Sequence, residues 1–72
     1  EKMRQIMDYL KDKKYVLFDE LMQLEKTRRG IIVLFLALLE LIRLRQVFAR
    51  QKEFFGEIRI YPLFREDFLS ER

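Results

Sequence analysis

The chain has 72 residues, of which 50% are hydrophobic and 38% are charged, and it carries a formal net charge of +3. This length allows one compact domain, near the lower size at which a single core holds a fold without crosslinks. The absence of cysteine excludes a disulfide scaffold, a thiolate metal site and a thiol nucleophile. Basic and acidic residues are mixed along the chain, which argues against a nucleic-acid-binding tail and favours a folded domain.

The first part of the chain predicts a helix followed by a short strand. Residues 2–12 place Met3, Ile6, Met7 and Leu10 at the spacing of one helical face, with charged residues elsewhere. The run 15–18 is aromatic and β-branched and too short for a helix, so it is predicted as a strand.

Two further helices are predicted before the next strand. Asp19 is the expected N-cap of a short helix, which ends where residues 26–30 interrupt the apolar pattern with charges and Gly30. The following stretch, Ile31 to Leu44, is predicted as the longest helix from its length and its Leu and Ala content. Its nearly uncharged part is shorter than the ~20 residues that cross a bilayer, so no membrane helix is expected.

The last part of the chain predicts a hairpin and a tail. Residues 47–52 and 57–61 alternate with a period of two around a turn at Gly56, and Pro62 is expected to end the second strand. The order of elements predicts an α+β fold, a small winged-helix domain with three helices, a short strand and a two-stranded wing. We assign residues 1–61 to this domain and 62–72 to a C-terminal tail that a partner could order. A three-helix bundle is the alternative.

A helical wheel of the long helix gives the main functional argument. One side is predicted to face the core, and it comprises Ile31, Leu34, Phe35, Leu38, Leu39, Leu41 and Ile42. The other side is mostly apolar where a DNA-reading helix would carry polar groups, and it comprises Val33, Leu36, Ala37, Glu40, Arg43 and Leu44. Either the hairpin and tail cover this outer side, or it is an exposed patch for a protein partner. Both alternatives disfavour DNA reading.

The hairpin and tail carry more aromatic groups than a solvent-facing segment needs. Phe55 and Ile58 are predicted to fold under the wing, whereas Phe64, Phe68 and Leu69 are candidates for a partner surface. Basic residues near the turn and the wing make phosphate contacts conceivable, but nearby acidic residues favour a solvated rim. With no histidine or cysteine and no activated hydroxyl, we expect no enzyme activity, cofactor or metal site.

The run from Phe35 to Ile42, FLALLELI, followed by Gln51 and then FGEI from Phe55, resembles the C-terminal winged-helix domain of the prokaryotic kleisins, the segregation and condensation protein A (ScpA) family. The resemblance implies a clasp that docks on the ATPase head of an SMC protein and closes a ring in chromosome condensation. It also implies a cytoplasmic, nucleoid-associated complex that meets DNA only indirectly, with an accessory ScpB-type protein contacting the full-length protein elsewhere. The chain departs from the family pattern at Arg45, often Gly, and at Leu34, often Thr.

On this hypothesis we expect the SMC head to contact a set of residues on the wing and the tail, namely Phe54, Arg59, Tyr61, Leu63 and Phe64. Two other classes remain open from the residues alone. The fold and positive charge would also suit a DNA-binding winged helix of a transcription regulator, which predicts salt-sensitive DNA affinity. A homodimer that buries the same apolar patch is the third possibility.

Overall fold

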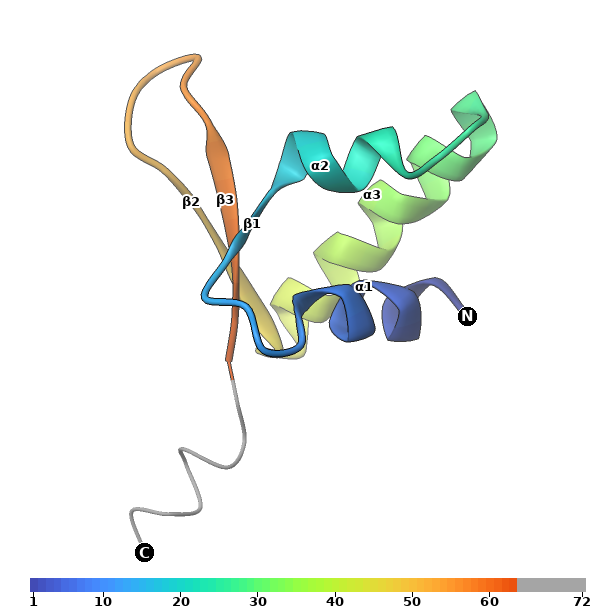
Figure 1. Cartoon of the computed structure of the whole chain (residues 1–72), viewed down its shortest axis with the longest axis horizontal. Coiled ribbons are helices and arrows are strands. Elements are labelled where there is room, and N and C mark those ends of the chain that lie inside the picture. The colour runs from blue at the N-terminus through green and yellow to red at the C-terminus, as the bar shows by residue number, and fades with distance from the viewer. Residues whose placement is uncertain (64–72) are drawn as a thin grey trace, which may run out of the picture.

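The computed structural model describes residues 1–63 and contains three helices and a three-stranded sheet, with the helices on one side of the hairpin (Figure 1). The elements are α1 (Lys2–Leu10), β1 (Val16–Leu17), α2 (Phe18–Gln23), α3 (Arg28–Arg43), β2 (Val47–Gln51) and β3 (Ile58–Pro62). This order confirms the predicted α+β winged-helix architecture, with the β2–β3 hairpin as the wing.

The sheet is antiparallel and has the order β1-β3-β2, so β3 is its central strand. In the wing, Phe48 lies opposite Tyr61 and Arg50 lies opposite Arg59. Pro62 pairs with Val47 as the last residue of β3, one residue beyond the predicted strand end. Its missing N–H costs the ladder little at a strand terminus.

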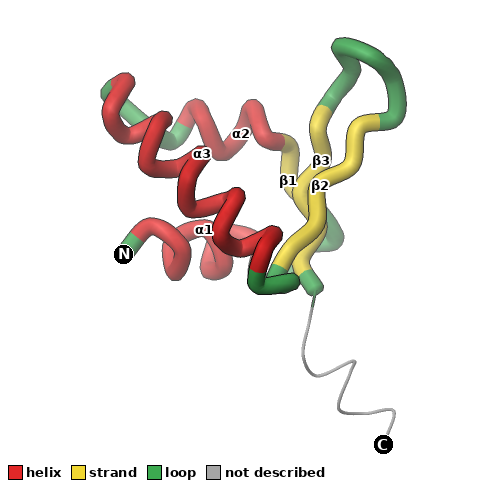
Figure 2. The backbone as a smooth tube through the Cα atoms, turned by 180° about the vertical axis from the view of Figure 1, so that it is seen from behind, coloured by secondary structure: helices red, strands yellow, loops and turns green. Residues whose placement is uncertain are grey.

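One hydrophobic cluster joins the helices to the inner face of the sheet. Figure 2 shows α3 crossing in front of α1 and leading through a short loop into the hairpin. The buried residues come from every element, and they are Ile6, Leu10, Val16, Leu21, Leu34, Ala37, Leu38, Leu41, Val47 and Ile60. Within residues 1–63 no buried side-chain nitrogen or oxygen lacks a hydrogen-bond partner, and no helix is long and apolar enough to cross a membrane.

The start of α2 differs from the prediction. Asp19 is not the N-cap, because the helix begins at Phe18 and Leu17 takes the cap position. The backbone N–H of Leu17 donates to Oε1 of Glu20 at 2.9 Å, which is the carboxylate half of a capping box. The strand before it is correspondingly shorter than predicted, since only Val16 and Leu17 pair with β3.

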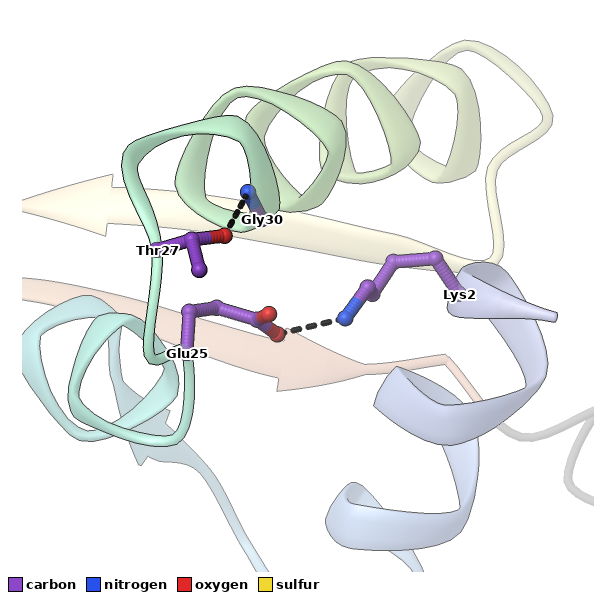
Figure 3. A network of polar contacts seen from close by, with 4 residues as sticks. All are labelled: Lys2, Glu25, Thr27 and Gly30. Atoms are coloured by element: carbon purple, nitrogen blue, oxygen red, sulfur yellow. Dashed lines mark hydrogen bonds and ion pairs between the residues drawn. The ribbon is translucent and has the colours of Figure 1, made fainter.

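The start of α3 was also predicted too late, because Gly30 lies inside the helix. Thr27 is the N-cap and its Oγ1 accepts from the N–H of Gly30 at 3.0 Å (Figure 3). Glu25 approaches the same turn and forms an ion pair with Lys2 of α1, with 2.5 Å between Nζ and Oε2. A Cβ on Gly30 would lie 2.5 Å from Oε1 of Glu25. The glycine therefore lets this carboxylate approach the first turn of α3, and it does not interrupt the helix.

The end of α3 is closed by a residue in the left-handed region. Arg45 has φ of 62°, and its N–H donates to the carbonyl of Ile42 at 3.0 Å. The N–H of Gln46 donates to the carbonyl of Leu41 at 2.9 Å, which completes a Schellman motif. The chain then turns directly into β2.

The wheel of α3 was partly wrong. Leu34, Leu38 and Leu41 are buried as predicted, but Ala37, which was assigned to the outer side, is buried with them. Four residues assigned to the core side are exposed instead, namely Ile31, Phe35, Leu39 and Ile42. Outer-side residues Val33, Leu36 and Leu44 are also exposed, so the wing does not cover this helix in the described part of the chain.

Candidate partner-binding surface

Strand alternation places part of the predicted contact set on the side of the sheet that faces away from the helices. Ile58, Ile60 and Pro62 of β3 point toward the core, and Ile60 is fully buried. The residues between and after them, Arg59, Tyr61 and Leu63, therefore share the opposite side. We call this side the outer sheet face and define it by Tyr15, Phe48, Arg50, Arg59, Tyr61 and Leu63.

Tyr61 is the centre of an aromatic cluster on the outer sheet face. Its ring stacks on that of Phe48 with a centroid distance of 4.8 Å and an interplanar angle of 6°. On its other side lies Tyr15, with 5.3 Å between centroids and a tilt of 42°. Three rings from three neighbouring segments thus form one apolar surface, with phenol groups available for hydrogen bonds.

Arg59 is one of the two cations of the outer sheet face, together with Arg50. Its guanidinium lies 4.6 Å from the ring centroid of Tyr15 and 3.7 Å from a carboxylate oxygen of Glu57. Hydrogen bonding to Tyr61, and then the electrostatic interaction with Tyr15, raise the pKa of Arg59 above its ordinary value. Its guanidinium is in any case a cation at physiological pH. Arg50 is its direct cross-strand partner, and two like charges in this register favour an anion that approaches both.

The charged end of the outer sheet face is hollowed. A shallow cavity of about 460 Å³ lies between the strands and the hairpin loop, and its lining residues are Arg50, Lys52, Glu53, Gly56, Glu57, Arg59 and Tyr61. Three cations and two carboxylates surround it, so its net charge is positive. The outer sheet face therefore combines an aromatic centre with a basic end, which suits a protein surface that is apolar with an acidic margin.

Leu63 continues this face past the end of β3. Its backbone N–H donates to the carbonyl of Gln46 at 2.9 Å, which ties the chain to the start of β2, and its side chain is exposed. Phe64, also predicted as a contact, lies outside the described residues, as do Phe68 and Leu69.

Phe54 is separated from the other predicted contacts. It lies in the hairpin loop beyond the last strand pair, is 87% exposed, and packs edge-on against Phe55 at 4.7 Å between centroids. Phe55 was predicted to fold under the wing together with Ile58, but only Ile58 packs against the core. Phe55 is 92% exposed, and its φ of 64° lies in the left-handed region.

The prediction missed Tyr15 and Phe48, which complete the aromatic cluster. The expected turn at Gly56 could not place Phe48 opposite Tyr61, because the observed strand pairs are centred between Phe54 and Phe55. Tyr15 had no local signal either, because its position depends on pairing between β1 and β3, which are far apart in sequence.

Comparison of the amino-acid sequence with known proteins assigns the chain to a family. Residues 1–63 match the family model described as segregation and condensation protein ScpA. The chain belongs to the ScpA family. One relative, segregation and condensation protein A of Caldanaerobacter subterraneus subsp. tengcongensis, is 37% identical over 65 residues, which cover 90% of this chain and 26% of the relative. The chain thus spans about a quarter of the length of this ScpA relative.

Proposed function

We propose that this chain is the C-terminal winged-helix domain of a prokaryotic kleisin and that it binds the ATPase head of an SMC protein through the outer sheet face. In this role it closes the SMC–kleisin ring that acts in chromosome condensation and segregation. The observation that carries the proposal is the aromatic cluster around Tyr61, an apolar surface beside cations on a member of the ScpA family. The domain contributes binding and no chemistry, and the SMC protein carries the nucleotide.

The geometry of the outer sheet face supports a contact set centred on Tyr61. Tyr61 is the proposed central contact, with Arg59 before it in β3 and Leu63 just past the end of that strand. Aromatic and arginine side chains dominate the binding energy of many interfaces when they lie near the centre. Phe54 at the hairpin tip and Phe64 after Leu63 are proposed as outlying contacts. An accessory ScpB-type protein is proposed to bind the full-length protein outside this domain, in a cytoplasmic complex associated with the nucleoid.

The exposed side of α3 supports protein binding over DNA reading. In the middle of the helix it presents Ile32, Leu36 and Leu39, which have no hydrogen-bonding groups for base edges. The cations of this helix lie in its first and last turns, away from that apolar centre.

The test is a titration of this chain with a purified SMC head fragment, followed by calorimetry and gel filtration. We expect a stable complex, and Tyr61→Ala should weaken it at least tenfold, because it removes the ring on which Phe48 and Tyr15 pack. Leu24→Ser is the matched control, since Leu24 is an exposed apolar residue at the end of α2, away from the outer sheet face. Absence of a complex at about 50 μM would reject the proposal. Equal losses of affinity in Tyr61→Ala and Leu24→Ser would reject the outer sheet face as the binding surface.

A further inference from the structure

The exposed side of α3 is a second apolar surface. Its central residues, which we call the helix face, are Ile32, Phe35, Leu36, Leu39 and Ile42. Leu36 is 58% exposed and Ile32 is 54% exposed, although each is a large aliphatic side chain. The buried residues of the same helix point into the core that also covers the inner side of the sheet. The helix face and the outer sheet face therefore point away from the core on different sides of the molecule.

The spacing of the helix face suits another helix. Ile32, Phe35, Leu39 and Ile42 follow one another at intervals of three, four and three residues, which is the a and d spacing of a helix-packing seam. At about 1.5 Å per residue the seam is roughly 15 Å long. A partner helix of about three turns would cover it, with Leu36 at its margin.

The charges around the helix face are basic at both ends. Arg28 and Arg29 lie in the first turn of α3, and Arg43 and Arg45 lie at its end, all of them exposed. Glu40 is the acidic residue of this helix, and both of its carboxylate oxygens already accept from Arg43. The Glu40–Arg43 pair has no net charge, so Arg45 supplies the net positive charge at the end of the seam, and Arg28 and Arg29 supply it at the start. The seam is thus an apolar strip with net positive charge at both ends.

This charge pattern opposes pairing with a second copy of the chain. In an antiparallel pair the first turn of one α3 would meet the last turn of the other, and arginines would face arginines. In a parallel pair equal ends would meet, again with arginines together. Like charges at both ends of a short seam disfavour either arrangement and favour an acidic partner.

We propose that the helix face binds an amphipathic helix from another protein, with an apolar stripe of a and d type and with Asp or Glu at both ends. This site is separate from the outer sheet face and does not rest on the SMC-head proposal. Loss of head binding would leave it intact.

The test uses the full 72-residue chain and two synthetic helical peptides of about 18 residues. Both peptides carry Leu at the seam positions, and one has Glu and the other Lys at its ends. By fluorescence polarisation we expect the Glu peptide to bind in the micromolar range and the Lys peptide at least tenfold more weakly. Leu36→Ser together with Leu39→Ser should weaken the Glu peptide at least tenfold, and Arg29→Ala should weaken it without touching the seam.

Leu24→Ser and Tyr61→Ala are the controls and should bind the Glu peptide like the unaltered chain. Equal binding of the two peptides, or no effect of the seam variants, would overturn the proposal. Light scattering that shows a dimer at 10–200 μM, lost in Leu36→Ser, would assign the face to a second copy instead. Cosedimentation with vesicles of phosphatidylcholine and phosphatidylglycerol would assign it to a lipid surface and equally overturn the proposal.

Discussion

Arg45 is one of three non-glycine residues in the described part of the chain that have a positive φ, and it closes α3. It lies at the left-handed C′ position after α3, with φ of 62°. Its own N–H makes one hydrogen bond of the Schellman motif, and the N–H of the next residue, Gln46, makes the other. A Cβ in this region is unfavourable, and glycine avoids the penalty. The left-handed conformation thus explains why the family that this sequence resembles often has glycine at this position.

Arg45→Gly should therefore stabilise the domain by about 0.5–1 kcal/mol, since it relieves the left-handed penalty without removing a buried contact. Urea unfolding followed by circular dichroism measures this change. Arg45→Ala keeps the Cβ and removes the charge, so it should leave the midpoint nearly unchanged. If the alanine variant is stabilised as much as the glycine variant, loss of the charge and not relief of the backbone conformation causes the stabilisation.

Single residues also show where prediction from sequence was limited. The period of two in residues 57–61 was enough to place Arg59 and Tyr61 on one side of the strand, because alternation needs no knowledge of the rest of the fold. Leu63 was assigned to the tail, since Pro62 was expected to end the strand one residue earlier than it does. Gly30 was misread as a helix end, since only the Lys2–Glu25 ion pair reveals that its missing side chain accommodates a carboxylate. Residue types set local preferences, and long-range contacts decide which preference applies.

At the scale of the elements, Glu20 connects the start of α2 to α1. Its carboxylate accepts from the N–H of Leu17 and, at 3.0 Å, from the hydroxyl of Tyr9. The backbone hydrogen bond from Leu17, followed by the one from Tyr9, lowers the pKa of Glu20 below its ordinary value, and the same contact raises the pKa of Tyr9. Folding thus favours the ionised form of Glu20.

A carboxyl group whose pKa is lower in the folded state than in the unfolded state stabilises the folded state at pH values above its unfolded-state pKa. This stabilisation is lost as the pH falls through the folded-state pKa. The contribution of Glu20 should therefore decline between about pH 5 and pH 3. Glu20→Gln keeps an oxygen that accepts from the N–H of Leu17 but removes the titratable carboxyl group. The difference in urea unfolding midpoint between the unaltered chain and this variant should therefore be largest at pH 7 and shrink toward pH 3. Urea titrations at several pH values measure it, with Glu53→Gln in the hairpin loop as control. A difference that does not change with pH would contradict the assignment.

The wheel of α3 failed for a physical reason. A helix with leucine or isoleucine on most sides has no polar side to orient it, so periodicity alone cannot fix which side is buried. Ala37 is buried because a small side chain allows close approach to neighbouring elements, whereas Phe35 lies at the margin and packs edge-on against Phe18 at 6.4 Å. The prediction that this helix is too apolar to read DNA did not depend on that choice.

At the scale of the whole molecule, the order of elements predicted the architecture because winged helices have few topologies that pair a short strand with a hairpin. The positions of its two exposed surfaces could not be predicted, since they depend on how α3 and the sheet share one core. The outer sheet face carries aromatic groups and cations, and the helix face is apolar with cations at its two ends. Neither has the polar set of a groove-reading helix.

The isolated chain should consequently bind duplex DNA weakly and without sequence preference. Its net charge of +3 allows some phosphate attraction, which salt should remove between about 50 and 200 mM. Fluorescence anisotropy with two unrelated duplexes of equal length measures this affinity across a salt series. Submicromolar binding that distinguishes the duplexes at physiological salt would support a DNA-reading regulator instead.

The position of β3 has a consequence for how the domain forms. It is the last strand of the described chain, yet both other strands pair with it, and Val16 meets Ile60 across most of the sequence. During synthesis, neither β1 nor β2 has a strand to pair with until β3 has emerged, and closing so long a loop is a slow step. Because Arg59 and Tyr61 belong to that strand, a partner that docks on them meets the complete surface only when the domain has finished folding.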